Sequence, residues 1–242
     1  MEFHAHGATH QGLVRPGNED AFVCGRRVFA VADGLGGHVA GEVASRVALG
    51  PVEALDGDDR DCAGLARALP QAVRDGNRAV IADAEEHPER FGMGTTLTAG
   101  VVCGAAVHLA HVGDSRAYLL RPDQGLRQLT TDHTPVAEAV AAGLLSPDDA
   151  AVHPERNVLS RVLGLDPHVE VDAPGPEPLQ PGDRLLLCSD GLTEVVRDDE
   201  IAAVLAEHHE PAAACDALIA AALAGGGPDN VTVVVGVAGA SG

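Results

Sequence analysis

Short apolar runs alternate along the chain with segments in which apolar residues recur at helical spacing. Five runs rich in apolar and β-branched residues predict strands, at 28–32, 95–103, 105–112, 185–188 and 231–237. Gly104 separates the second run from the third and indicates a tight hairpin. Two weaker runs, at 117–120 and 126–130, predict a second hairpin, because Pro, Asp and Gly between them favour a turn. Several runs are apolar at consecutive positions, which is typical of strands that are covered on both faces.

The spacing of the apolar residues predicts helices at 38–55, 62–87, 198–207 and 211–224. The segment 134–163 also has a helical pattern, but Ser146-Pro147 and His153-Pro154 interrupt it. Strand runs outnumber the helices that could cross between them, which favours antiparallel sheets over a doubly wound parallel sheet. We therefore predict an α+β fold in which two antiparallel sheets pack together and helices cover them.

The composition narrows the function classes. The chain has 242 residues, with 36 acidic and 16 basic side chains and a formal net charge of −20. A surface this acidic repels phosphodiester backbones, so we expect no nucleic-acid partner. All of the basic residues are arginines. Without a lysine, the chain can form neither a Schiff base nor a Walker-type phosphate loop. Only 2% of the residues are aromatic, so the core must be aliphatic.

Two features of the sequence indicate a reduced, intracellular compartment. No run approaches the roughly 18 apolar residues that span a bilayer, and the first twelve residues lack the basic start and apolar stretch of a secretory signal. We therefore expect no membrane segment and a cytoplasmic location. The five cysteines are widely spaced, at Cys24, Cys62, Cys103, Cys188 and Cys215. An odd number with no close pair predicts reduced core thiols rather than disulfides or a zinc site.

Four aspartates stand at the ends of predicted strands. Asp33 and Asp190 each follow an apolar run. Asp114 follows the run 105–112, and Asp229 precedes the last run. In an antiparallel sheet the end of one strand lies beside the start of the next, so the four side chains can converge on one rim. A single Asp-Gly pair more often caps a turn, but four such aspartates in one chain favour a shared site.

A cluster of carboxylates calls for a cation, because like charges raise one another's pKa. Arg116 is the only basic residue within a few positions of any of the four aspartates. Oxygen ligands favour Mg²⁺ or Mn²⁺, and two such ions about 4 Å apart would activate a water and hold a phosphoryl oxygen. Near the N-terminus, Arg15 precedes Glu19 and Asp20. Arginine can grip a phosphate through two nitrogens, although this segment alone is equally consistent with an ordinary charged loop.

A second acidic segment, at 56–61, does not fit a metal site. It contains an Asp-x-Asp pattern but follows a predicted helix rather than a strand. It also has Asp61 where a calcium loop needs glycine. We interpret this segment as solvated surface.

Eight short motifs resemble, in the same order, those of the metal-dependent protein Ser/Thr phosphatases of type 2C in their compact bacterial form. They lie at 12–15 with 18–20, 33–38, 92–96, 113–116, 129–133, 153–154 with 156–157, 188–192 and 227–232. Each motif is weak alone, but their order along nearly the whole chain is highly specific. The resemblance implies a four-layer αββα sandwich. It also implies that residues 1–242 form a single catalytic domain with a flap subdomain at about 134–165.

The resemblance implies a metal site of two Mn²⁺ or Mg²⁺ ions. Asp33 would bridge the two ions, and the carbonyl of Gly34 would bind the second. Asp190 and Asp229 would complete the ligands of the first ion, and Asp190 would thereby count among the catalytic residues. Asp114, together with Asp190, would hold a third, weaker ion.

Other residues would serve the substrate and the attacking water. Arg15 would bind the substrate phosphate, and a metal-activated water would attack phosphorus directly, without a phosphoenzyme. Three residues would hold the water around the ions without binding the ions themselves: Glu19, Asp20 and Asn230. The leaving oxygen needs a proton. Some members of the family carry a histidine where this chain has Leu35, and His38 is the nearest candidate here. A packing role at a helix start is equally compatible with His38, and metal-bound water could also supply the proton.

The implied function is dephosphorylation of phosphoserine and phosphothreonine in proteins by a monomer that opposes a bacterial Ser/Thr kinase. The flap is acidic, through Glu138, Asp148, Asp149 and Glu155. It could therefore favour basic sequence around the phosphorylated residue. Three further residues near the flap are interpreted as structural supports: His133, His153 and Arg156. Two alternatives stay open, a phosphatase of a stress or sporulation partner switch and a catalytically silent domain that binds phosphoproteins.

Overall fold

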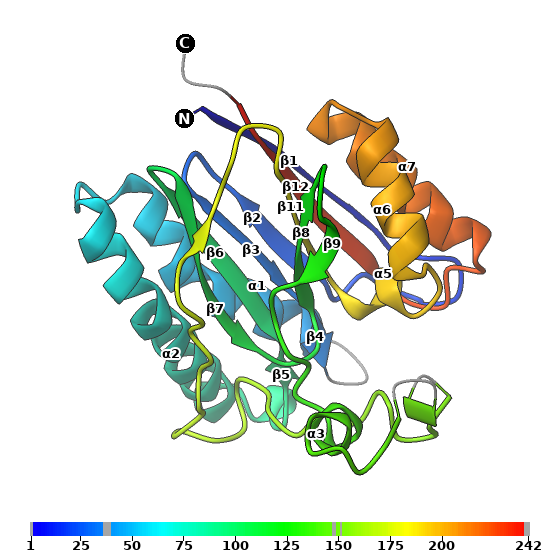
Figure 1. Ribbon diagram of the computed structural model, residues 1–242. Coiled ribbons are helices and arrows are strands. Elements are labelled where there is room, and N and C mark those ends of the chain that lie inside the picture. Colours follow the sequence, from blue (N-terminus) through cyan, green and yellow to red (C-terminus); the bar gives the residue numbers. More distant parts are fainter. Residues whose placement is uncertain (1, 36–39, 147–148, 151, 240–242) are drawn as a thin grey trace.

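The computed structural model describes residues 2–35, 40–146, 149–150 and 152–239, and two five-stranded antiparallel sheets form its centre (Figure 1). The strand order of the first sheet is β1 (Phe3–His10), β12 (Val231–Ala238), β11 (Arg184–Cys188), β8 (Arg116–Arg121) and β9 (Gly125–Gln128). The order of the second is β10 (Glu177–Pro178), β7 (Ala106–Val112), β6 (Leu97–Cys103), β3 (Val28–Ala32) and β2 (Ala21–Cys24). A short pair, β4 (Gly34–Leu35) and β5 (Gly94–Thr95), continues from the ends of the second sheet.

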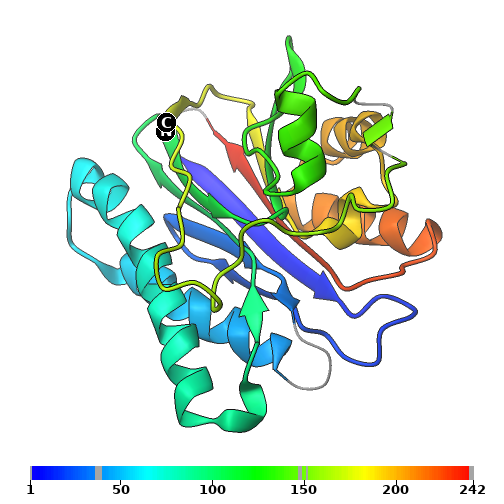
Figure 2. The same cartoon turned by 90° about the horizontal axis from the view of Figure 1, so that it is seen from below.

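Helices cover the two outer faces (Figure 2). The second sheet carries α1 (Gly41–Glu53) and α2 (Cys62–Glu86), which pack on each other and on β3, β6 and β7. The first sheet carries α7 (Pro211–Ala224), on β1 and β12, with α6 (Asp198–Glu207) beside it. The predicted four-layer αββα sandwich is confirmed. No helix among the described residues is long and apolar enough to cross a membrane.

The alternation of side chains along β3 shows how the layers are held together. All five residues of this strand are buried. Phe29 and Val31 point into the apolar layer between the sheets, with Leu187 and Val234 of the first sheet. The intervening residues of β3 face the layer under α1 and α2. Because successive side chains of a strand point to opposite faces, a strand buried on both faces must be apolar throughout.

Several element predictions agree with the structure, and others do not. The helices α6 and α7 have the predicted bounds, and Gly104 turns between β6 and β7 with a φ of +64°. Strands β1 and β2 were not predicted, because β1 alternates half-buried with exposed positions and contains histidines and a glycine rather than an apolar run. Within 134–163 the prediction gave too much helix. The segment contains the helix α3 (Pro135–Ala141), whereas residues 152–163 form turns and extended chain.

The prediction that all five cysteines are reduced is wrong. Cys62 and Cys103 form a disulfide, with Cα atoms 5.4 Å apart and a separation of 41 in sequence. Cys62 is the first residue of α2, and Cys103 is the last residue of β6. Packing of the helix on the sheet brings the two together, and the spacing of cysteines along the chain cannot reveal this. The other three cysteines have free thiols, as predicted.

Candidate active site

A cavity of about 430 Å³ opens where strands of both sheets end. The residues that line it include all four strand-end aspartates, together with Arg15, Glu19, Gly34 and Asn230. Asp33 follows β3, Asp114 lies in the turn between β7 and β8, Asp190 begins the short helix α5 (Asp190–Thr193), and Asp229 precedes β12. The structure thus brings together groups that are as far apart in sequence as Arg15 and Asp229.

The strand register explains why the aspartates meet. In the ladder between β11 and β8, Cys188 pairs with Arg116. Asp190 and Asp114 each lie two residues beyond this pair, at the same end of the ladder, so the register places them opposite each other. In the second sheet, Thr96 donates its backbone N–H to the carbonyl of Asp33 at 2.9 Å, which continues the pairing of β3 with β6 up to the cavity.

Buried hydroxyls fix the backbone around Asp33 and Asp114. Asp33 donates its backbone N–H to Thr96 Oγ1 at 3.1 Å, and Thr95 donates its hydroxyl to the Asp33 carbonyl at 2.8 Å. Thr96 Oγ1 also lies 2.7 Å from the hydroxyl oxygen of Ser115, the residue after Asp114. The two carboxylate-bearing turns are therefore linked through side chains that carry no charge. No local pattern assigned this role to Thr95, Thr96 or Ser115, although all three lie in the motifs at 92–96 and 113–116.

Two of the aspartates are followed by glycines, and steric crowding explains why only glycine fits at these positions. A Cβ atom on Gly34 would lie 2.1 Å from the carbonyl oxygen of Gly41. A Cβ atom on Gly191 would lie 1.9 Å from the carbonyl oxygen of Asn230. Backbone atoms at these distances leave no room for any side chain. The Asp-Gly pairs thus let other chain segments pass directly beside the carboxylates.

The carboxylates of the cavity destabilise one another's charged forms. Burial, aided by the charges of Asp20 and Asp190, raises the pKa of Asp33 well above its usual value. Burial and the charge of Asp114 do the same for the pKa of Asp190. Burial raises the pKa of Asp20 and of Asp114 to about 6. Such a site favours a bound cation, because a cation would return each of these groups to its ionised form.

Two buried oxygen atoms support the fit to divalent cations. Asp20 Oδ1 and Asp190 Oδ1 are both buried without a hydrogen-bond partner. An unpaired buried carboxylate oxygen is costly unless a metal ion or water contacts it. No group of three or more acidic, histidine or cysteine side chains in the described parts of the chain is close enough to hold an ion by itself. Mg²⁺ and Mn²⁺ suit such a site, because Mg²⁺ in particular is held by one or two carboxylates and keeps several waters.

Arg15 is the one basic residue among the described residues that line the cavity. Its Nη2 donates to Asp229 Oδ2 at 2.5 Å, and this hydrogen bond raises the pKa of the guanidinium. The side chain is 53% exposed and lines the cavity. A guanidinium in this position can receive an anionic group that enters the cavity.

Asn230 organises the loop that carries Arg15. Its Oδ1 accepts the backbone N–H of Glu19 at 2.8 Å. Its Nδ2 donates to the carbonyls of Gln11 and Gly17, each at 2.8 Å. Nearby, Ser189 donates its hydroxyl to Asp20 Oδ2 at 2.8 Å. The three residues expected around the metal ligands, Glu19, Asp20 and Asn230, therefore all lie at or directly behind the cavity wall.

Comparison with known proteins agrees with this geometry. The family described as protein phosphatase 2C matches residues 9–224. The chain belongs to this family. The serine/threonine protein phosphatase PstP of Mycobacterium tuberculosis is 46% identical over 94% of this chain, but the chain spans only 43% of that protein's length. The serine/threonine phosphatase stp of Listeria monocytogenes is 39% identical over 96% of this chain and 94% of its own.

Solved phosphatase 2C structures have the same fold. The M. tuberculosis PstP/Ppp structure superposes with a TM-score of 0.93 at 43% identity, covering 99% of this chain and all of its own. The PstP catalytic domain in complex with two manganese ions superposes with a TM-score of 0.89 at 43% identity, covering 98% of this chain and 99% of its own.

Among the described residues of this phosphatase 2C chain, His133 and the acidic segment 56–61 do not line the cavity. His38 lies outside the described residues, so its role as the acid stays a prediction. His133 is buried, and its Nδ1 accepts the backbone N–H of Gly113 at 3.0 Å. In the segment 56–61, the carboxylate of Asp56 accepts three backbone N–H groups, from Arg26, Arg27 and Val28. Although burial opposes the change, these donors lower the pKa of Asp56, which suits a structural turn.

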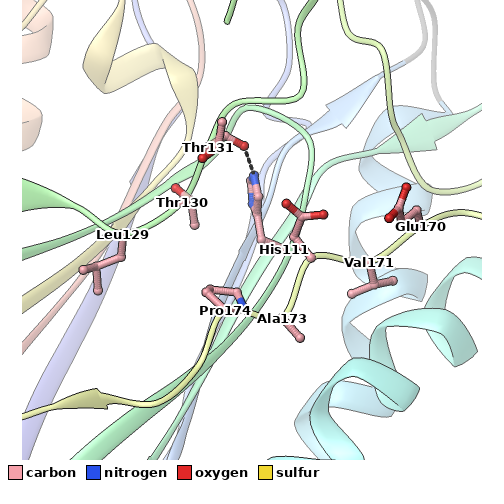
Figure 3. Close-up of a pocket in the computed structure, with 9 residues that line it drawn as sticks. His111, Leu129, Thr130, Thr131, Glu170, Val171, Ala173 and Pro174 are labelled. Atoms are coloured by element: carbon pink, nitrogen blue, oxygen red, sulfur yellow. Dashed lines mark hydrogen bonds between the residues drawn. The ribbon is translucent and has the colours of Figure 1, made fainter. Parts of the chain in front are cut away.

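A second cavity, of about 330 Å³, lies beside His111 (Figure 3). The imidazole Nε2 of His111 lies 3.1 Å from the carbonyl oxygen of Thr131, and Nδ1 lies 2.8 Å from Thr98 Oγ1. Burial lowers the pKa of His111 to about 4, so the ring is neutral. None of the predicted site residues is among the described residues that line this cavity. It therefore adds nothing to the reaction expected at the first cavity.

Proposed function

We propose that this chain hydrolyses phosphoserine and phosphothreonine esters in proteins with the aid of divalent cations. The observation that carries the proposal is one cavity that holds four aspartates and a single exposed arginine. An acidic centre with one basic group at its mouth suits a substrate that is anionic at one end only. Its membership of the protein phosphatase 2C family, and relatives named as serine/threonine phosphatases, support the same reaction.

The proposed cofactor is Mn²⁺ or Mg²⁺, with two ions per chain and a third, weaker one. Asp33, Asp190, Asp229 and the Gly34 carbonyl would hold the first two, and Asp114 with Asp190 would hold the third. When bound, the ions would polarise the phosphoryl oxygens and lower the pKa of a water. The two manganese ions in the PstP structure support this choice. The buried, unpartnered oxygen of Asp190 supports it independently.

The chain's own residues orient the substrate. Arg15 binds two phosphoryl oxygens through its guanidinium and so positions the phosphorus over the carboxylates. In the free protein Arg15 is bonded to Asp229 and is therefore already held near the cavity. Glu19 and Asp20 would accept hydrogen bonds from waters around the ions and so hold these waters in place. The leaving oxygen receives a proton from His38 or from water.

The proposed substrates are phosphoproteins, and the opposing enzyme is a Ser/Thr kinase. We propose further that residues 1–242 form one catalytic domain with a flap at about 134–165, that it is a monomer, and that it acts in the cytoplasm. The described acidic residues of the flap are Glu138, Asp149 and Glu155, whereas Asp148 lies outside the described residues. Phosphopeptides with flanking arginines should therefore be hydrolysed faster than those with flanking glutamates. Equal rates would remove the proposed preference.

The central experiment measures p-nitrophenyl phosphate hydrolysis in the presence of Mn²⁺. We expect activity to fall to background with EDTA and in Asp190→Asn, because both remove a divalent ion from the centre. Asp123→Asn is the matched control, since Asp123 lies exposed in the turn between β8 and β9 and its loss should leave the rate unchanged. Equal activity with Mn²⁺, with EDTA and in Asp190→Asn would exclude a metal-dependent phosphatase. Activity lost in Asp123→Asn as well would point to a folding defect.

A further inference from the structure

The flap, residues 134–165, is anchored at its ends to the turn after β7 and to β5. At its first residue it adjoins the buried His133, whose backbone N–H and Nδ1 both bond to Gly113. At its last turn, Ser160 donates its N–H to the carbonyl of His133 at 2.8 Å, and Leu163 exchanges two hydrogen bonds with Thr95. Both ends are therefore fixed to segments that also carry or adjoin Asp114 and Asp33.

The part of the flap between these anchors, residues 135–159, is held much more weakly. Figure 1 shows its helix α3 beyond the ends of the strands. Three of its large apolar side chains are exposed: Leu144, Val152 and Val158. Val136 is buried. Elements with few buried contacts open at low free-energy cost.

Among the described residues of 135–159, one hydrogen bond connects a flap side chain to the rest of the protein. Asn157 Nδ2 donates to Glu194 Oε1. The other side-chain hydrogen bonds of this segment stay within residues 134–160, such as that from Ser160 to Glu138 at 2.8 Å. In the described part of this segment, the polar attachment of side chains to the rest of the protein is thus a single hydrogen bond to a carboxylate.

One partner of this contact lines the catalytic cavity, and the other lies on the short helix that begins at the cavity wall. Asn157 lines the cavity together with Leu159 from the same segment and Asp190 from α5. Glu194 is the C-terminal cap of α5, and its backbone N–H bonds to the carbonyl of Asp190 at 2.8 Å. The contact therefore attaches the flap to the short helix that begins with an expected metal ligand.

We propose that the Asn157–Glu194 hydrogen bond holds the flap as one wall of the cavity and makes these two residues determinants of specificity for phosphoprotein substrates. They are positioning residues, since they act through the flap and not on the reacting atoms. A phosphopeptide extends beyond its phosphorylated residue and must lie against the cavity wall. Holding the wall in place before binding avoids an ordering cost at the moment of binding. The inference rests on the proposed function, because it names a determinant of that same site.

Hydrogen exchange of the flap amides tests the structural part of the inference without reference to activity. We expect Asn157→Ala and Glu194→Ala each to speed exchange in 135–159 by on the order of fivefold, the size typical of one hydrogen bond. The double variant should exchange no faster than either single variant. Glu194→Gln is the matched control, because its amide oxygen accepts the same hydrogen bond after the charge is removed. It should exchange at the wild-type rate.

Kinetics on a phosphothreonine peptide test the effect on substrate. The two alanine variants should raise KM by on the order of fivefold with little change in kcat, and their effects should not add in the double variant. Unchanged flap exchange in both alanine variants, or additive effects on KM, would overturn the inference. So would a KM in Glu194→Gln as high as that in Glu194→Ala, because the charge of Glu194 would then be the cause. Activity that survives EDTA would overturn the proposed function, whereas unchanged flap exchange in the alanine variants would overturn only the flap contact.

Discussion

Reduction of the Cys62–Cys103 disulfide should destabilise the folded chain strongly without impairing its chemistry. The bond closes a loop between residues that are 41 positions apart. In the chain-entropy description, a loop of this length loses about 4 kcal/mol of stabilisation when it is opened. For a chain of this size, such a loss corresponds to a fall in Tm of roughly 8–16 °C. The bond therefore accounts for a large share of the stability that a domain ordinarily has.

Activity at moderate temperature should survive reduction, because the bond lies far from the cavity. Thr96 stands at the cavity end of β6 and Cys103 at the other. A strand rises about 3.4 Å per residue, which separates the two positions by roughly 24 Å. The p-nitrophenyl phosphate rate at 25 °C is thus expected to be the same with and without reductant.

Thermal unfolding followed by circular dichroism, with and without a phosphine reductant, measures the effect. The double variant Cys62→Ala, Cys103→Ala should unfold at the lower temperature under both conditions. Cys24→Ala is the matched control and should still respond to reductant, since Cys24 has a free thiol. Thiol titration of the unfolded protein should find three free thiols before reduction and five after. Five thiols before reduction would show that no bond forms, and three thiols with an unchanged Tm would refute the loop argument.

Three further predictions concern the cavity. Gly191→Ala should lower the free energy of unfolding, measured in urea, by about 1–3 kcal/mol and should also reduce activity, because its Cβ would meet a backbone carbonyl. Gly57→Ala should change neither quantity, because the space around Gly57 is open. Arg15→Ala should lower kcat/KM for p-nitrophenyl phosphate roughly 10- to 100-fold, with partial recovery in Arg15→Lys, and an unchanged kcat/KM would remove Arg15 from phosphate binding. In the metal-free chain the pKa of Asp20 and Asp114 lies at about 6, above the unfolded value. Their contribution to stability is therefore complete below about pH 4 and is lost as the pH rises through about 6. Urea unfolding at pH 5 and pH 7.5 should show a smaller fall in stability for Asp114→Asn than for the parent chain, and Mn²⁺ should reduce the fall in the parent.

The sequence predicted best the elements whose burial leaves a local pattern. Strands β3, β11 and β12 are apolar at nearly every position because both of their faces are covered. Strand β1 lies at a sheet edge and has half-buried and exposed positions along its length. Because it contains histidines, it lacks the apolar run that predicted the other strands. The disulfide was missed for a similar reason. It depends on where α2 packs, and no local pattern records that.

The candidate site was predictable where charge reveals it. Aspartates at strand ends are uncommon enough to suggest a shared rim, and all four line one cavity. The neutral groups that hold them were not predictable. Thr96 and Ser115 are buried, and in the sequence a buried Thr or Ser that holds a site cannot be distinguished from one that only fills the core. The contact between Asn157 and Glu194 depends on the path of an irregular segment, for which local sequence patterns carry little information.

The pairing of β1 with β12 bears on when the catalytic centre can form during synthesis. β12 lies between β1 and β11, and it pairs with β1 from Phe3–Ala238 to His10–Val231. Arg15 and Asp20 follow the first of these strands, and Asp229 precedes the second. Contacts between such distant parts of a chain slow folding, and they cannot form before the ribosome has released the later strand. A nascent chain that lacks β12 therefore leaves β1 without its partner and the cavity without one of its four aspartates. Activity should appear abruptly once β12 has left the ribosome, and should not grow gradually with chain length.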